Sequence, residues 1–205
     1  MFDRTALKIT KPAVDVAARQ IVKSGFNADQ VTLIAFAFGM CASLLIAIGH
    51  SWLAVVPLLI GRILDGLDGA VARQTVQTDR GAFMDITLDF LFYASVPLAF
   101  AIAAPSSNAL PAAILLAAFV GTGTSFLAYA TLAEKRGEKS TAYPSKSFYY
   151  LGGLTEGTET IATFTLMCLF PQHFALLAYI YATLCTLTTI TRIIAGWHNF
   201  AAVKK

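Results

Sequence analysis

The sequence predicts an all-α fold: an integral membrane bundle of six transmembrane helices with an N-terminal amphipathic helix at the membrane interface. Of the 205 residues, 57% are hydrophobic and only 13% are charged, whereas an ordinary soluble domain is roughly 25% charged. The apolar residues also gather into six stretches, each long enough to span a bilayer. We expect one domain, residues 1–205, with a juxtamembrane helix region at 1–26 and the six-helix bundle at 27–200.

The first predicted element is an amphipathic helix between residues 12 and 24. Apolar side chains fall on one face at helical spacing: Val14, Ala17, Ala18, Ile21 and Val22. The opposite face carries Asp15, Arg19 and Lys23, each four residues apart. This pattern favours a helix that lies on the inner leaflet. The alternative is an ordinary cytoplasmic helix that packs on the rest of the protein.

Six spans follow this helix. They are predicted at residues 30–49, 52–72, 82–104, 109–133, 147–170 and 174–198. The breaks after the first, third and fifth spans are short and contain no Lys or Arg, whereas the breaks at 74–80 and 134–146 are longer and polar. Because basic residues collect on the cytoplasmic side, the short breaks are predicted to face outward. Both termini are then cytoplasmic.

Four carboxylates occupy the neighbouring ends of the second and third predicted spans. Asp65 and Asp68 are three residues apart, and Asp85 and Asp89 are four apart, so each pair shares a helix face. The connecting loop is short, so the two helices should be antiparallel neighbours with the two pairs facing each other. Ionisable groups within a span are costly and indicate a function.

Facing carboxylates repel one another unless they hold protons or cations. Oxygen ligands suit Mg²⁺ or Mn²⁺, and no His or Cys lies near enough in sequence to suggest zinc. A pair of such ions would suit phosphoryl transfer. Small residues between the acids, Gly66 and Gly69 among them, leave room for a close approach of backbone or ligand. The alternative for each acid taken singly is a solvated helix cap.

The acids form part of a recognisable pattern. The chain reads D65-G-L-D68-G69-A-V-A72-R73 and then G81-A-F-M-D85-I-T-L-D89. It resembles the class I CDP-alcohol phosphatidyltransferases, whose pattern is DxxDGxxAR followed by GxxxDxxxD, and all eight specified positions match. The seven residues between Arg73 and Gly81 make a spacer one residue shorter than is usual in that family.

The resemblance implies a role for each matched acid. Asp65, Asp68 and Asp85 would bind two divalent cations, Mg²⁺ or Mn²⁺. Asp89 would complete the metal site and act as the catalytic general base on the hydroxyl of the acceptor.

The resemblance also implies a nucleotide site, a reaction and a location. The nucleotide-binding positions would be Asp68, Gly69, Ala72, Arg73 and Gly81. The reaction would move a phosphatidyl group from CDP-diacylglycerol to a small alcohol and release CMP. The chain is most similar to small members of the bacterial inner membrane, which would make it a multi-pass protein with a cytoplasmic active site. Membrane lipid and a second copy, in a homodimer, would be its further partners.

The acceptor has to be inferred from residues outside this pattern. Cations near the cytoplasmic side could hold a phosphorylated acceptor, and they are Lys135, Arg136, Lys139, Lys146 and Arg192. The alternative for the loop lysines is the inside bias of basic residues alone. Glu156 and Glu159 could bind acceptor hydroxyls or an amine, or could simply favour the start of a helix. These residues do not distinguish between acceptors, and the resemblance implies glycerol 3-phosphate, the commonest bacterial acceptor of the family.

Other substrates and another class of function stay open at this point. An inositol phosphate, serine or phosphatidylglycerol could replace glycerol 3-phosphate, and a CDP-choline or CDP-ethanolamine type donor could replace CDP-diacylglycerol. Intramembrane acids also occur in ion or proton transporters, but the outward halves of the spans contain no ionisable residue other than terminal His. The small net charge of +3, without a basic stripe, predicts no nucleic-acid partner.

Overall fold

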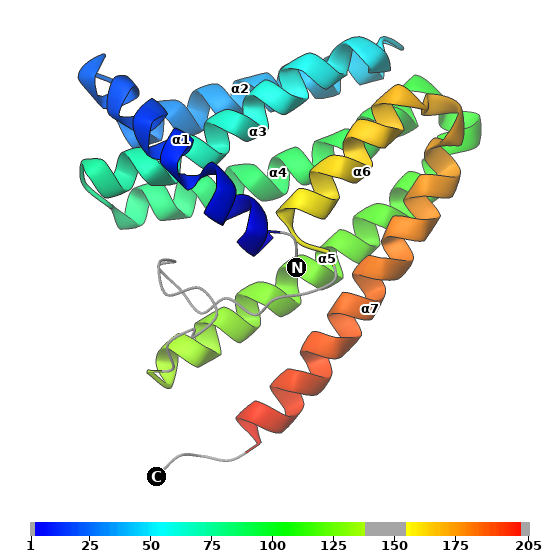
Figure 1. The fold of residues 1–205 in the computed structure, drawn as a ribbon. Coiled ribbons are helices and arrows are strands. Elements are labelled where there is room, and N and C mark those ends of the chain that lie inside the picture. Colours follow the sequence, from blue (N-terminus) through cyan, green and yellow to red (C-terminus); the bar gives the residue numbers. More distant parts are fainter. Residues whose placement is uncertain (1–2, 138–154, 202–205) are drawn as a thin grey trace.

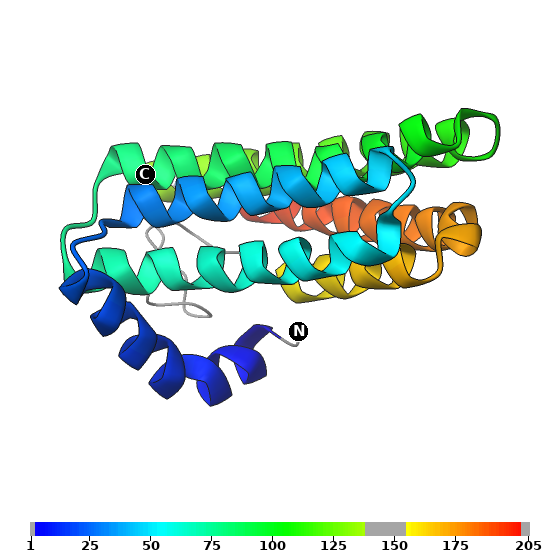
Figure 2. The same cartoon turned by 90° about the horizontal axis from the view of Figure 1, so that it is seen from above.

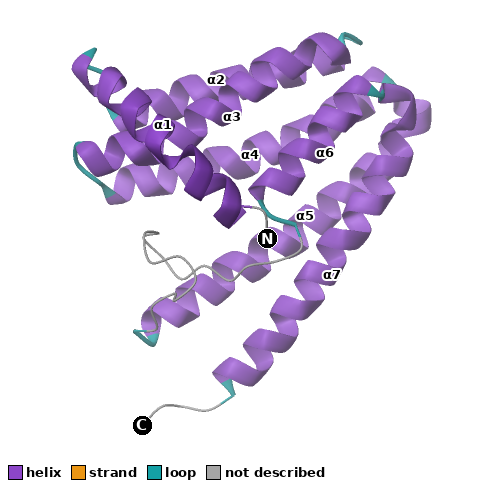
Figure 3. Ribbon diagram, viewed as in Figure 1, coloured by secondary structure: helices purple, strands orange, loops and turns teal. Residues whose placement is uncertain are grey.

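The computed structural model describes residues 3–137 and 155–201, and all elements in these two ranges are helical (Figure 3). The elements are α1 (Asp3–Lys23), α2 (Ala28–Ala47), α3 (Ser51–Gln74), α4 (Asp79–Ala103), α5 (Pro105–Lys135), α6 (Gly157–Leu169), the short 3₁₀ helix η1 (Pro171–His173) and α7 (Phe174–Phe200). The predicted all-α fold is confirmed for the described residues.

Helices α2 to α7 run back and forth between the two ends of an elongated bundle, and α1 lies outside them (Figures 1 and 2). The turns after α2, α4 and α6 lie at one end. The turns before α2 and between α3 and α4 lie at the other, together with the last turns of α5 and α7. Helix α2 packs on α3 and α4, and α5 packs on α4 and α7.

Within residues 3–137 and 155–201, four helices are long and apolar enough to cross a membrane: α2, α4, α5 and the segment Pro171–Phe200, which joins η1 to α7. The other two predicted spans differ for separate reasons. Helix α3 carries Arg62, Asp65 and Asp68 from its middle onward, which lowers its hydropathy. Of the predicted span 147–170, residues 147–154 lie outside the described ranges, and the 13 described residues of α6 extend only about 20 Å. Six spans therefore stay a prediction.

Side-chain caps start the two helices that enter the bundle beside the predicted site. Asn27 and Gln30 form a capping box at the start of α2, in which Gln30 N donates to Asn27 Oδ1 at 2.9 Å. At the start of α4, Gly81 N donates to Thr78 Oγ1 at 3.0 Å. These bonds satisfy backbone donors that a helix leaves unpaired, and they define where each helix begins.

The predicted apolar face of α1 packs on the protein. Ala18 is fully buried against Val31 of α2 and Ala70 and Val71 of α3. The remaining predicted members of this face are half-buried, and Arg19 and Lys23 on the opposite face are exposed. The alternative of a helix packed on the protein thus accounts for the apolar face, and a position at the membrane surface stays a prediction.

Two glycines allow close approaches in the bundle, Gly61 of α3 to α2 and Gly39 of α2 to α4. A Cβ at Gly61 would lie 2.9 Å from the backbone oxygen of Ala35, and one at Gly39 would lie 2.6 Å from the ring of Phe92. Small residues at a crossing let helix backbones approach each other within a membrane. This contact places α2 beside the half of α3 that carries the acids.

Candidate active site

Three of the four predicted acids converge. Oxygen atoms of Asp65, Asp68 and Asp85 all lie within 4.8 Å of one another. Asp65 and Asp68 share a face of α3 because they are one turn apart, and Asp85 faces them from the first turns of α4. The prediction that the two helices present these acids to each other is confirmed for these three.

Asp68 is the most buried of the three, with 6% of the residue exposed. Thr32 on α2 donates a hydrogen bond to Asp68 Oδ2 at 2.6 Å. The hydroxyl thereby fixes the orientation of the carboxylate, as partners behind a metal ligand commonly do. The sequence pattern contains no sign of Thr32, since it lies 36 residues before Asp68.

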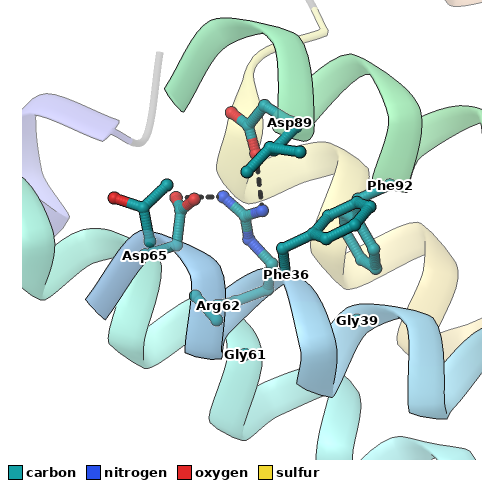
Figure 4. Close-up of a pocket in the computed structure, with 10 residues that line it drawn as sticks. Phe36, Gly39, Gly61, Arg62, Asp65, Asp89 and Phe92 are labelled. Atoms are coloured by element: carbon teal, nitrogen blue, oxygen red, sulfur yellow. Dashed lines mark hydrogen bonds and ion pairs between the residues drawn. The ribbon is translucent and has the colours of Figure 1, made fainter. Parts of the chain in front are cut away.

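Asp89 has a different partner. Its Oδ1 accepts a hydrogen bond of 2.7 Å from Arg62 Nη1, and Arg62 Nη2 forms an ion pair with Asp65 Oδ2 (Figure 4). Arg62 was not among the predicted site residues because it lies three positions before the motif. The signal that could have found it is an arginine inside an apolar stretch, which is costly unless it is paired.

Two aromatic rings of α4 also lie beside the Arg62 guanidinium. Its central carbon lies 5.3 Å from the ring centroid of Phe92 and 5.5 Å from that of Tyr93. Both distances lie within the range of attraction between a cation and an aromatic ring. The arginine side chain is only 18% exposed.

A cavity of about 890 Å³ opens beside the acids. That volume lies within the usual range of ligand sites, about 300–1,000 Å³. Asp65, Asp85 and Asp89 line one part of it, and Glu156 and Arg192 from the other side of the bundle line another part. Much of the remaining wall is apolar and comes from α4 to α7, including Phe90, Phe119, Phe126, Leu116 and Ile161. The cavity thus joins an acidic centre to a polar region about α6 and α7.

The predicted nucleotide-binding residues other than Asp68 lie toward the end of α3 and the start of α4. Arg73 is exposed, and a Cβ at Gly69 would lie 3.5 Å from Arg73 Nη1. Gly81 packs closely on another part of the chain, because a Cβ there would lie 3.0 Å from Asp29 Oδ1. Ala72 is half-buried. Their role toward a nucleotide stays a prediction.

The structure separates the predicted acceptor residues into groups. Glu156 and Arg192 are buried and line the cavity, and Arg192 Nη1 donates to the Thr122 carbonyl at 3.0 Å. Glu159 is half-buried and Lys135 exposed, and neither is among the described residues that line the cavity. Lys139 and Lys146 lie outside the described residues.

Arg136, another predicted acceptor cation, caps a helix. Its guanidinium donates to the carbonyl oxygens of Asn199 at 2.8 Å and Phe200 at 2.9 Å, which end α7. A cation at this end is favourable because the helix dipole leaves partial negative charge there.

The donor set of the three-acid cluster fits a hard divalent cation. Three carboxylates within 4.8 Å supply the oxygen ligands that Mg²⁺ and Mn²⁺ prefer. Asp89 is not part of this group, and one of its oxygens is paired with Arg62.

The sequence of this chain is similar to those of known proteins. Residues 26–198 match the family profile described as CDP-alcohol phosphatidyltransferase. Over 205 residues the chain is 49% identical to the inner membrane protein YnjF of Escherichia coli (strain K12), with 100% of both chains covered. It is 32% identical over 97 residues to the archaetidylinositol phosphate synthase of Pyrococcus horikoshii, covering 47% of this chain and 51% of that one.

Solved structures share the fold. The phosphatidylinositol phosphate synthase PgsA1 of Mycobacterium tuberculosis with CDP-DAG bound has a TM-score of 0.70 at 20% identity, covering 90% of this chain and 93% of that one. The same enzyme in complex with manganese and citrate has a TM-score of 0.71 at 20% identity, covering 90% and 88%. At this identity the similarity concerns the arrangement of the helices.

Proposed function

Because the chain belongs to the CDP-alcohol phosphatidyltransferase family, we propose that it transfers a phosphatidyl group from CDP-diacylglycerol to the hydroxyl of a small alcohol and releases CMP. The observation that carries this proposal is the cluster of Asp65, Asp68 and Asp85 at the wall of a cavity of about 890 Å³. The acids occupy the positions that the family pattern specifies, and the cavity has room for the reacting ends of two substrates.

Asp65, Asp68 and Asp85 would hold a divalent cation, Mg²⁺ or Mn²⁺. The ion would supply positive charge to the pyrophosphate of the donor. The resemblance implies two such ions with Asp89 as a ligand, but we assign one ion to the three-acid cluster because the Arg62 guanidinium lies between Asp89 and Asp65 and pairs with an oxygen of each.

Asp89 is the proposed general base. It lines the cavity beside the cluster, so an acceptor hydroxyl can reach it. As the acceptor oxygen forms its bond to the phosphorus that carries the diacylglycerol, the hydroxyl proton passes to Asp89. The bond between that phosphorus and the CMP oxygen breaks, and CMP leaves with the electron pair. Arg62 holds Asp89 in place through its other oxygen, so the base is oriented before substrate binds.

Arg192 is the proposed binding residue for a phosphorylated acceptor. Its side chain is buried in the cavity wall. The central carbon of its guanidinium lies 5.5 Å from the ring centroid of Phe126. A guanidinium there can pair with phosphate oxygens. Glu156, on the same cavity, is proposed to accept hydrogen bonds from acceptor hydroxyls.

Glycerol 3-phosphate is the first candidate acceptor, as the resemblance implies. An inositol phosphate is the second. The names of two similar proteins, a phosphatidylinositol phosphate synthase and an archaetidylinositol phosphate synthase, favour it. Both candidates are phosphorylated polyols, so both suit Arg192.

We place the protein in the bacterial inner membrane with the acids on the cytoplasmic side. Arg73, Arg80, Lys135 and Arg136 lie at the end of the bundle nearest the acids, whereas the turns at the other end contain no Lys or Arg. Basic residues remain on the cytoplasmic side, so CMP would leave to the cytoplasm while the acyl chains stay in lipid. A homodimer, which the resemblance implies, stays a prediction.

The test is CMP release by the purified protein with CDP-diacylglycerol and Mn²⁺ or Mg²⁺. Glycerol 3-phosphate, an inositol phosphate, serine and phosphatidylglycerol would each be supplied as the acceptor, with an acceptor-free control. We expect release to require an acceptor and a metal and to stop in excess EDTA. No release with any of these acceptors, or full release in EDTA, would contradict the proposal.

The acceptor site has a separate test. Arg192→Gln should raise the KM for the phosphorylated acceptor about tenfold or more, because it removes a charged hydrogen bond. The KM for CDP-diacylglycerol should change less. Lys135→Gln is the control, since Lys135 is exposed at the end of α5. Equal KM values for Arg192→Gln and the unmodified protein would exclude Arg192 from the acceptor site.

A further inference from the structure

Arg62 connects two acids that come from different helices. One terminal nitrogen of its guanidinium binds Asp89 of α4, at 2.7 Å, and the other binds Asp65 of α3. The planar guanidinium therefore lies between the two carboxylates (Figure 4). Asp65 is also a member of the three-acid cluster, so Arg62 lies directly beside that cluster.

Groups on α3 and α4 fix the position of Arg62 at the cavity wall. Arg62 lies one turn before Asp65 on α3, which directs both side chains to the same face. The rings of Phe92 and Tyr93 face the guanidinium from α4. Gly61 brings the backbone of α2 against this part of α3, because a Cβ there would lie 2.9 Å from the Ala35 backbone oxygen. Another side of Arg62 lines the cavity of about 890 Å³.

We propose that Arg62 supplies a permanent second positive charge to the reaction centre, so that this chain binds one divalent cation, at Asp65, Asp68 and Asp85, and no second ion at Asp89. The inference rests on the proposed function. It assigns Arg62 as a positioning residue that acts through Asp65 and Asp89.

The physical reason is competition between like charges. An arginine stays protonated in proteins, so a second divalent ion between Asp65 and Asp89 would have to displace the guanidinium or lie in contact with it. Either arrangement is unfavourable, because two cations in contact repel each other at short distance. Displacement would also separate Arg62 from both carboxylates and both rings. With Arg62 in place, Asp89 is freed from metal binding and can act as the base.

The experiment counts metal ions. Equilibrium dialysis against Mn²⁺, with and without CDP as a soluble fragment of the donor, gives the number of ions bound per folded chain. We expect one ion in the unmodified protein and one in Arg62→Lys, which keeps a positive charge. Arg62→Gln removes the charge and should bind two. Arg80→Gln is the matched control, because Arg80 pairs with Asp29 outside the acid cluster, and it should bind one.

Two ions in the unmodified protein, or a single ion in folded Arg62→Gln, would overturn the inference. Folding is checked by monodisperse elution and helical circular dichroism. If Arg62→Gln does not fold, the ion counts for the unmodified protein and for Arg62→Lys still test the inference, because each should be one. The count does not depend on turnover, so a protein that releases CMP while holding two ions would refute this inference and leave the proposed function intact. A protein that binds one ion and releases no CMP would refute the proposed function.

Discussion

Thr32 on α2 donates a hydrogen bond of 2.6 Å to Asp68 on α3 and so joins these two helices at the most buried acid of the cluster. The bond links a helix that carries none of the motif to a predicted metal ligand. Its loss should therefore affect both the stability of the fold and the affinity for metal.

Thr32→Val tests this bond, because valine has the shape of threonine without the hydroxyl. A buried carboxylate that loses a partner costs about 1–3 kcal/mol, and loss of an outer partner weakens metal binding about 10–100-fold. We expect a lower midpoint of thermal unfolding and a weaker apparent Mn²⁺ affinity in a titration. Thr165→Val is the control, since the Thr165 hydroxyl donates only to Ile161 within its own helix. Equal effects of the two substitutions would contradict the role of Thr32.

Asp89→Asn and Asp85→Asn should separate proton transfer from donor binding. Asp89→Asn removes the base and should lower turnover by about 10²–10⁴, while calorimetric binding of CDP in the presence of Mn²⁺ changes little. Asp85→Asn removes a ligand of the cluster and should weaken that binding as well. Loss of CDP binding as severe in Asp89→Asn as in Asp85→Asn would show that the roles are not separate. Turnover near that of the unmodified protein in Asp89→Asn would exclude it as the base.

Gly61 and Gly66 lie on the same helix and should respond in opposite ways to alanine. A Cβ at Gly61 would lie 2.9 Å from the Ala35 backbone oxygen, whereas one at Gly66 would have no neighbour within 4 Å. Overpacking costs about 1–3 kcal/mol, and alanine is a better helix former than glycine by about 1 kcal/mol. The temperature at which the protein aggregates in detergent should fall for Gly61→Ala. For Gly66→Ala it should stay the same or rise. A similar shift in both would mean that the contact between α2 and α3 tolerates the methyl group.

The orientation in the membrane can be tested with reporters at the two ends of the bundle. A reporter inserted after Pro105 or after Pro171, at the end without Lys or Arg, should be external. A reporter after Lys205 should be cytoplasmic. Labelling of the C-terminal reporter from outside intact cells would place the acids on the external side and contradict the proposed exit of CMP.

Some features of the site were predictable because they depend on spacing along one helix. Asp65 and Asp68 share a face through helical periodicity alone, and the short loop before α4 brings Asp85 opposite them. The apolar stretches and the distribution of basic residues likewise lie along the chain and can be counted. This is why the all-α fold could be predicted, together with the convergence of three of the four acids.

The partners of Arg62 could not all be predicted from spacing along one helix. Its distance of three residues from Asp65 is visible in the sequence, but its bond to Asp89 crosses 27 residues and two helices. The proposal that Asp89 acts as a base and not as a metal ligand depends on that bond. The grouping of Glu156 and Arg192 around one cavity, with Lys135 outside it, likewise depends on how α5, α6 and α7 pack.

The sequence by itself determined the apolar helices, the faces on which the acids lie and the family pattern, because periodicity and composition act over a few turns of helix. Only the tertiary structure decided the partners of those acids: Thr32 for Asp68, and Arg62 for Asp89. The physical reason is that a buried charge is stabilised by whichever group the packing of distant helices places within hydrogen-bond distance, and that placement depends on contacts such as the one between Gly61 and Ala35.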